Sequence, residues 1–214
     1  MKYLMYVGTK NYSLNTENDV ERLNPLMFSS NHKIIYGTSN LVNDLKSSYS
    51  TLFNDAVKKY NTLYPKKQIL NYYEKINKSR KVSLATGVLI RYGNKHDWNY
   101  IKKDYKKIAA LYEKQFLVFK RELLDKFYIT NAIVYFENIP CLRIIGIPFK
   151  INNNPNKLEK QVYKSDCFNL KSFSLLREIL KADIEITFKN LNFIIDDEFY
   201  NNFDEDMYIQ KTLF

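Results

Sequence analysis

Histidine and cysteine are scarce in this sequence, and that scarcity limits the metal and redox chemistry open to it. His32 and His96 are the two histidines among 214 residues, so a divalent-metal site built from three imidazoles is excluded. Cys141 and Cys167 are the two cysteines, too few for a disulfide framework in a chain of this length. Such cysteine usage indicates a reducing compartment.

Long apolar runs are also missing. The first 13 residues (MKYLMYVGTKNYS) contain no apolar stretch long enough for a signal peptide, and no segment is long enough to span a bilayer. No phosphate-loop motif, zinc-type ligand spacing or Ser-His-Asp pattern stands out. We therefore expect a cytoplasmic protein with no cofactor and no membrane partner.

The charge is positive overall and unevenly distributed. The formal net charge is +10, yet residues 182–210 contain eight carboxylates against Lys189 alone, so the remainder carries about +17. A basic body of this kind favours a polyanionic partner such as DNA or RNA, although solvated lysine faces would give the same composition.

Hydrophobic periodicity predicts strands and helices that alternate along the chain. Strands are expected at 2–7, 82–91, 132–135 and 142–149, with two further extended pieces at 184–188 and 191–195. Helices are expected at about 40–64, 97–127 and 168–182, the first capped by Thr38 or Ser39 and the second by Asp97. Residues 11–30 are expected to form a loop or a short broken helix. No repeat or interdomain linker is found, so we expect one domain over residues 1–195 and an acidic tail at 196–214.

The segment that says most about function is 131–149, NAIVYFENIPCLRIIGIPF. Its apolar stretches Ala132–Tyr135 and Leu142–Phe149 flank a short connection and predict a β-hairpin. It resembles the metal-binding hairpin of the plasmid mobilisation and recombination relaxases (the Mob/Pre, MobV-type family). In that family the first strand ends in a histidine and a Pro-His-x-His run opens the second strand. Here Tyr135 stands at the first histidine position, Cys141 and Arg143 stand at the other two, and Glu137 is an acidic neighbour.

A second segment extends the resemblance. Residues 19–24 (DVERLN) resemble the family's first motif, His-x-x-Arg-Glu-Asn, whose histidine is the nucleophile. Asp19 stands at that histidine position here, while Arg22 is retained. Motif order and spacing agree over most of residues 1–185. The resemblance implies an α+β fold with a relaxase-like antiparallel or mixed sheet, flanking helices and a single domain.

The resemblance also bears on activity, because the family nicks one DNA strand with the help of a metal. This chain is similar to a degenerate member that lacks the metal-binding histidines, so we assign no catalytic residue and no metal. The function expected is that of a catalytically inactive relaxase-like protein of a plasmid or phage, which binds nucleic acid without cleaving it. Arg143 is expected either to bind a phosphate in the emptied pocket or to form a salt bridge with Glu137.

Further nucleic-acid contacts are expected from residues 64–81, where basic residues alternate with aromatic ones. The alternative for this stretch is a solvated loop whose two tyrosines pack inward. The complete set of candidate nucleic-acid-binding residues is Arg22, Lys66, Lys67, Tyr72, Tyr73, Lys78, Arg80, Lys81 and Arg143.

Two other functions stay open at this point. One is a phage or plasmid counter-defence protein, such as a CRISPR-nuclease inhibitor, that binds a host nuclease or ribonucleoprotein complex. The other is a divergent strand-cleaving replication initiator with a tyrosine nucleophile, for which Tyr135 is expected to be the most exposed candidate.

Overall fold

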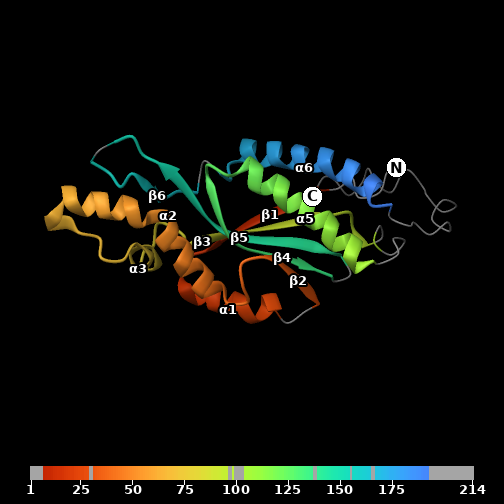
Figure 1. Cartoon of the computed structure of the whole chain (residues 1–214), viewed down its shortest axis with the longest axis horizontal. Helices are drawn as coiled ribbons and strands as arrows, with labels where there is room; N and C mark the ends of the chain where they lie inside the picture. Colours follow the sequence, from red (N-terminus) through yellow and green to blue (C-terminus); the bar gives the residue numbers. More distant parts are fainter. Residues whose placement is uncertain are drawn as a thin grey trace.

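The computed structural model describes residues 7–28, 31–95, 98, 104–136, 139–154, 156–164 and 167–192. Its centre is an antiparallel sheet in the order β1-β3-β5-β4-β2, with the short β6 paired to the far end of β5 (Figure 1). The strands are β1 (Val7–Leu14), β2 (His32–Tyr36), β3 (Ala85–Tyr92), β4 (Phe127–Tyr135), β5 (Cys141–Ile151) and β6 (Lys160–Val162). The helices are α1 (Glu17–Phe28), α2 (Leu41–Leu63), the 3-10 turn η1 (Pro65–Lys67), α3 (Tyr72–Asn77), α5 (Tyr105–Glu122) and α6 (Leu170–Asn190).

The central strand β5 is apolar on both sides because the sheet has a core on each face. Leu142 and Ile144 are buried in one core with α5 and α6, while Ile145 and Ile147 are buried in the other with α2 and α3. Successive strand residues point to opposite faces, which explains why β5 reads as a continuous apolar run rather than an alternating one.

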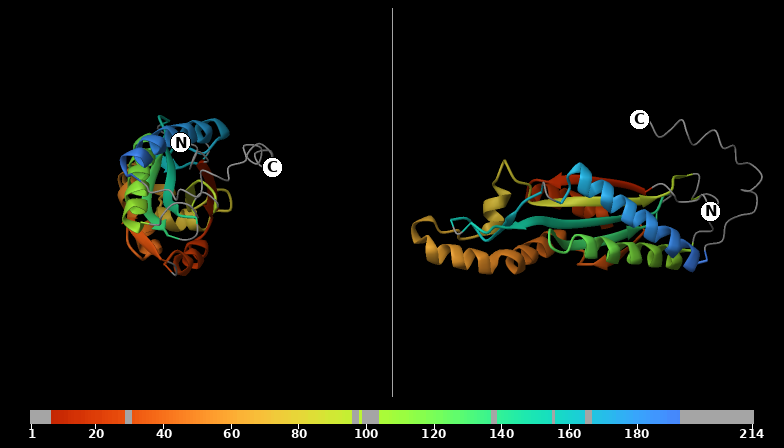
Figure 2. Two further views of the ribbon diagram at one scale, coloured as in Figure 1. Left: turned by 90° about the vertical axis from the view of Figure 1, so that its right-hand side faces the viewer. Right: turned by 90° about the horizontal axis from the view of Figure 1, so that it is seen from above.

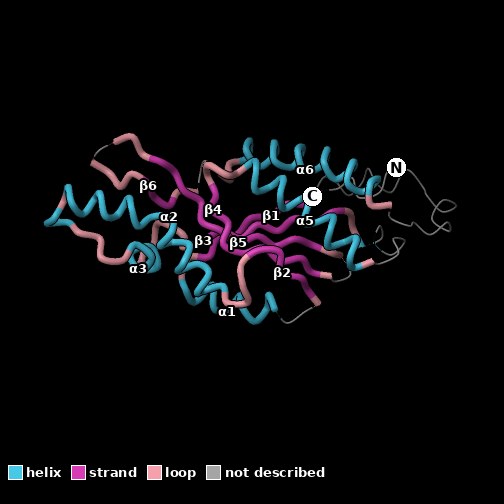
Figure 3. The backbone as a smooth tube through the Cα atoms, in the orientation of Figure 1, coloured by secondary structure: helices cyan, strands magenta, loops and turns pink. Residues whose placement is uncertain are grey.

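The helices divide between these two faces. Helices α5 and α6 run next to each other over one face, and α1, α2 and α3 cover part of the other (Figures 1 and 2). Helix α2 continues beyond the sheet together with β6, which makes the described part of the molecule elongated (Figure 3). Among the described residues, every helix is too short or too polar to serve as a transmembrane span.

The structure confirms the central hairpin and the three main helices and corrects several boundaries. Helix α2 is capped by Asn40, whose side chain accepts a hydrogen bond from the Asn43 amide at 3.1 Å, rather than by Thr38 or Ser39. Helix α5 begins at Tyr105 with Asp104 as its cap, and Asp97 lies outside the described residues. The expected strand at 184–188 is wrong, because these residues continue helix α6 to Asn190.

The N-terminal third contains more regular structure than its polar composition predicts. The first strand covers Val7–Leu14, while residues 2–6 of the expected strand lie outside the described residues. A loop or a short broken helix was expected at residues 11–30, but residues 11–14 belong to strand β1 and residues 17–28 form helix α1. Strand β2 at residues 32–36 was not expected. Of the extended piece expected at 191–195, residues 191 and 192 form a turn, and residues 193–195 lie outside the described residues, as does the acidic segment 196–214.

Candidate nucleic-acid interface

The hairpin residues singled out by the sequence come together on one face of the sheet. The β4–β5 register places Tyr135 opposite Cys141 and Ile133 opposite Arg143, and β2 adds His32 opposite Tyr135. Directly opposed residues of an antiparallel pair share a face. This is the face of α1, α2 and α3, since Ile133, Tyr135 and Cys141 belong to that core.

Arg143 lies half-buried near the middle of this face. Its guanidinium carbon is 5.2 Å from the centre of the Tyr135 ring, which is a cation–π arrangement. Its Nε is shielded from solvent and makes no hydrogen bond with the described residues. A buried donor without an acceptor costs about 1–3 kcal/mol, so this Nε–H opposes the stabilising contact with Tyr135.

Two further cations share the face with Arg143. Lys10 of β1 lies opposite Leu89 of β3, and Leu89 lies opposite Arg143, so the three residues form one row across the sheet. Arg91 is diagonal to both cations, two residues along β3 from Leu89. Lys10 and Arg91 are exposed, and neither they nor Arg143 form an ion pair with a described carboxylate. We call Lys10, Arg91 and Arg143 the cationic row.

The phenol of Tyr12 completes this part of the face. Tyr12 pairs with Gly87, and its Oη is buried without a hydrogen-bond partner among the described residues. Burial raises the pKa of Tyr12, while the positive charge of Arg143 acts in the opposite direction. The phenol is therefore protonated at neutral pH and lies within the electrostatic reach of the guanidinium.

The residues at the hairpin do not fit a divalent metal. In the described part of the chain, no group of three or more His, Cys, Asp or Glu side chains is placed to hold an ion. The guanidinium of Arg143 puts a fixed positive charge over Tyr135, where a cation would be repelled. Glu137 lies outside the described residues, and with it the expected Arg143–Glu137 salt bridge.

Asp19 has a structural use that the resemblance did not predict. Its Oδ2 accepts hydrogen bonds from the amides of Asn15 at 2.8 Å and Thr16 at 3.0 Å, and its own amide donates to Thr16 Oγ1 at 3.4 Å. This reciprocal pattern is a capping box at the start of α1. Arg22 is exposed on the same helix.

In the basic stretch 64–81 the two tyrosines pack inward, which is the alternative to base stacking given in the sequence analysis. Tyr73 is 5% exposed and donates a hydrogen bond from its hydroxyl to Glu17 Oε2 at 2.8 Å. Tyr72 packs edge-on against Phe53 at 4.8 Å, and its hydroxyl accepts a hydrogen bond from the Val162 amide. Tyr73 belongs to the core and Tyr72 packs against it half-buried, which leaves little ring surface for base stacking. The basic members of the stretch remain exposed: Lys66, Lys67, Lys78, Arg80 and Lys81.

The expectation that Tyr135 is an exposed candidate nucleophile is wrong. Tyr135 is 3% exposed because the α2-side core lies around it and Arg143 covers its ring. Lys10, Arg91 and Tyr12 were missed, since only strand register places them beside Arg143. The alternation of β3, which leaves Arg91 exposed between buried neighbours, was the one local signal for its position.

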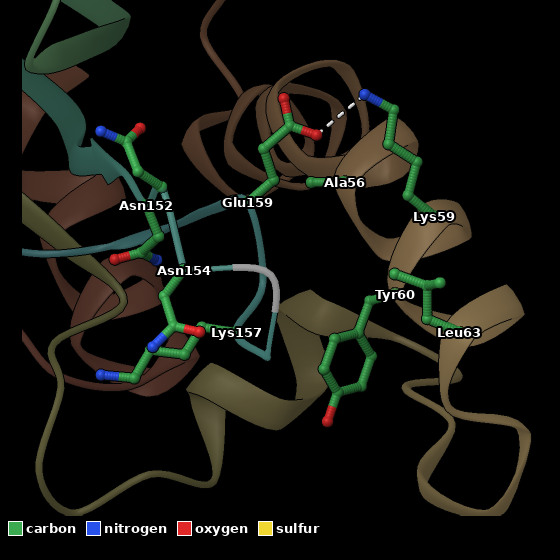
Figure 4. Close-up of a pocket in the computed structure, with 9 residues that line it drawn as sticks. Ala56, Lys59, Tyr60, Leu63, Asn152, Asn154, Lys157 and Glu159 are labelled. Atoms are coloured by element: carbon green, nitrogen blue, oxygen red, sulfur yellow. Dashed lines mark hydrogen bonds and ion pairs between the residues drawn. The ribbon is translucent and has the colours of Figure 1, made fainter.

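A shallow cavity lies at the far end of α2, away from the hairpin. Its volume is about 180 Å³, and it is lined by α2 and by the connection between β5 and β6 (Figure 4). Lys59 and Glu159 form an ion pair at 2.8 Å on its rim, and Asn152 and Tyr60 also line it. None of the residues predicted from the sequence to bind nucleic acid lines this cavity.

Comparisons with known proteins identify the fold. No protein-family model matches the chain, and no curated protein matches its sequence. A manganese-bound crystal structure of the MobM relaxase domain (MOBV; Mob_Pre) with 22-nucleotide pMV158 oriT DNA is similar at 11% identity and a TM-score of 0.56, covering 89% of each chain. The same domain with 26-nucleotide oriT DNA is similar at 12% identity and a TM-score of 0.55, covering 94% of this chain and 95% of the other. The chain therefore has a Mob/Pre-like, single-domain α+β relaxase fold.

Proposed function

We propose that this protein binds nucleic acid through the part of the sheet that carries the cationic row, on the face of α1, α2 and α3, and does not cleave it. The observation that carries the proposal is the cationic row, because three positive charges on one face have no described carboxylate to neutralise them. Uncompensated cations raise the local concentration of polyanions and gain free energy by releasing counterions from phosphates. Both structural neighbours are bound to plasmid oriT DNA, which favours DNA as the partner.

The absence of cleavage is the second part of the proposal. Tyr135, Cys141 and Arg143 occupy the positions where the resembled family places metal-binding histidines, and such a site cannot be formed from a phenol, a thiol and a guanidinium. Asp19 occupies the nucleophile position, yet its carboxylate is committed to the cap of α1. The chain would thus be a degenerate relaxase-like protein of a mobile genetic element.

The exposed basic residues of the 64–81 stretch extend the surface. Arg80 and Lys81 precede β3, whereas Arg91 stands near its other end, so the length of β3 from Ala85 to Arg91, about 20 Å, separates the two groups. A polyanion lying along this side of the sheet would contact the cationic row first and Lys66, Lys67, Lys78, Arg80 and Lys81 next. Arg22 of α1 lies on the same side.

The domain division and the compartment belong to the same proposal. We assign residues 1–195 to the binding domain and residues 196–214 to an acidic segment with a net charge of −5, and we place the protein in the cytoplasm. Removing the acidic segment should strengthen nucleic-acid binding, because it removes charge that repels phosphates.

The test is a titration against labelled single-stranded DNA, duplex DNA and RNA at several salt concentrations, with and without manganese. Binding that weakens steeply with salt, with no cleavage product, is the expected result. Metal-dependent nicking would overturn the non-cleaving part. If none of the three binds at low salt, the nucleic-acid proposal fails, and a host nuclease or ribonucleoprotein complex becomes the partner to test.

Replacing Lys66, Lys67, Arg80 and Lys81 together by serine tests the extended surface separately. We expect weaker binding and a shallower dependence of affinity on salt, since fewer phosphates are neutralised. An unchanged salt slope would remove this stretch from the interface and leave the cationic row.

A further inference from the structure

The ring of Tyr12 lies across a glycine of the neighbouring strand. A Cβ atom added at Gly87 would be 2.1 Å from Tyr12 Cζ and 2.5 Å from its Oη. No other residue at position 87 leaves room for the phenol in this place. Gly87 therefore fixes the Tyr12 hydroxyl next to the strand that carries Arg143.

Two hydrogen-bond donors on this part of the face lack acceptors. Tyr12 Oη and Arg143 Nε are both shielded from solvent, and neither makes a hydrogen bond with the described residues. The Tyr12 ring lies across Gly87 of β3, the strand that pairs with β5, and Arg143 of β5 is on the same face. The charge of Arg143 also opposes the rise in the pKa of Tyr12. Polar groups buried without partners are rare in folded proteins, and each calls for an explanation.

We infer that Tyr12 and Arg143 form a site for one phosphoryl oxygen, an inference that rests on the proposed nucleic-acid binding and names the group that is bound. The phenol and the guanidinium each donate to the ligand, and the Tyr135 ring lies beneath the guanidinium, 5.2 Å from its carbon. The ligand has to supply only acceptor oxygens, because the Tyr12 hydroxyl and the Arg143 guanidinium both act as donors.

A phosphate fits the surroundings better than a carboxylate. Lys10 and Arg91 place two more positive charges around the site, spread over three adjacent strands. That span is about 10 Å across the sheet, which is more than one carboxylate would contact. Successive phosphates of one nucleic-acid strand would contact the exposed cations and the half-buried Arg143. A single phosphoryl group would reach Tyr12 Oη and Arg143 Nε once these two side chains turn outward, because both atoms are shielded in the free protein.

The decisive variant is Tyr12→Phe, because a structural role and a binding role predict opposite results. The hydroxyl has no partner in the free protein, so its removal should leave the melting temperature unchanged or raise it. Affinity for a single-stranded oligonucleotide should fall about tenfold, as expected for the loss of a hydrogen bond to a charged group. A lower melting temperature with unchanged affinity would overturn the inference.

Two companion variants separate the hydroxyl from charge and position. Arg143→Lys keeps the charge but loses the Nε–H and the planar fork, and should also weaken binding about tenfold. Gly87→Ala displaces the Tyr12 ring without removing a polar group and should weaken binding in the same way. Lys106→Ser, at an exposed lysine of α5 outside this face, is the matched control: it should leave both the oligonucleotide affinity and the melting temperature unchanged.

Inorganic phosphate distinguishes a free-phosphate site from a nucleic-acid site. The Nε–H resonance of Arg143, followed by NMR, should shift on adding the oligonucleotide and, at higher concentration, on adding inorganic phosphate. If the wild type binds the oligonucleotide and Tyr12→Phe binds it equally, this inference fails and the proposed function stands. If the wild type binds no oligonucleotide, the proposed function fails, and a shift with phosphate alone would still support the site while no shift would overturn it.

Discussion

The two faces of the central sheet are built for different purposes. On the α5–α6 face, β3 presents Val88, Ile90 and Tyr92, all fully buried. On the opposite face, the same strand presents Leu89 and Arg91, one half-buried and one exposed. Near this end of β3, one side of the strand is committed to the core and the other is left accessible, whereas Ala85 at the start of the strand is buried on that second side as well.

The polar groups of the two faces show the same contrast. On the α5–α6 face, the Tyr92 hydroxyl donates to Gln115 Oε1 at 2.6 Å, and the Gln115 amide donates to Asp183 of α6. On the other face, Tyr12 Oη and Arg143 Nε have no acceptor among the described residues. Thr86 Oγ1 on the α5–α6 face is also buried without a described hydrogen-bond partner, so an unsatisfied group alone does not distinguish the two faces. What distinguishes Tyr12 and Arg143 is that their unpaired donors share a face with the exposed cations Lys10 and Arg91, where a ligand can supply the acceptors.

The largest expected effect on stability comes from opening a cavity in the core between the sheet and helices α5 and α6. Phe119 of α5 is fully buried and packs edge-on against Phe127 at 5.8 Å. Phe119→Ala should lower the free energy of unfolding by about 3–5 kcal/mol, measured by urea denaturation. Leu117→Ala, two residues away and 62% exposed, is the matched control and should change it by less than about 0.5 kcal/mol. A loss below about 1 kcal/mol for Phe119→Ala would mean that this face is not the main core.

A smaller loss is expected when the buried network is cut without opening a cavity. Gln115→Leu leaves the Tyr92 hydroxyl without its acceptor and Asp183 without one of its donors, which should cost about 2 kcal/mol. Adding Tyr92→Phe to that variant removes the unpaired Tyr92 hydroxyl and should recover part of the lost stability. If the double variant is less stable than Gln115→Leu, the hydroxyl has another partner.

Substitutions in the cationic row should change the affinity for nucleic acid and leave the free energy of unfolding unchanged. Lys10→Ser with Arg91→Ser removes two exposed cations, so the slope of log affinity against log salt for single-stranded DNA should fall by about 1.4. The control is Lys106→Ser with Lys114→Ser, two exposed lysines of α5, which should leave the slope unchanged. Equal effects from the two pairs would show that net charge, rather than the open face, governs binding.

The sequence predicted the parts of this contrast that depend on local pattern. The hairpin was recognisable because β4 and β5 are apolar runs with a short connection between them, and the stripe of α2 was recognisable from its spacing. Thr16 and Asp19 form a capping box, and their spacing of three residues is also visible in the sequence. Residues 184–188 were misread, since Ile184 and Phe188 are four apart and fit a helix face as well as a strand.

The cationic row was not predictable from local pattern. Lys10, Leu89 and Arg143 are distant in sequence and meet only through the registers of β1 with β3 and β3 with β5. A shift of one residue in either register would send one of the cations to the opposite face. Register between strands that are not joined by a hairpin depends on the whole fold, so this site could be found only in the structure.

The smallest expected effect concerns the contribution to stability of the Glu17 contacts, which join α1, α2 and α3. Glu17 accepts hydrogen bonds from Lys46 and from the Tyr73 hydroxyl, and the bond from Lys46 is the main reason why the pKa of Glu17 is lowered. A lowered pKa in the folded state means that the stabilisation is present above the unfolded-state value of about 4.3 and is lost as pH falls through the folded value. Glu17→Gln should therefore be less stable than the wild type by under about 1 kcal/mol at pH 7, and the difference should close below about pH 4.

Glu159→Gln is the control, because the Lys59–Glu159 pair is more than half exposed on both sides and should contribute less. A pH-independent difference for Glu17→Gln would assign the effect to packing, and the carboxylate would then have no part in joining α1, α2 and α3.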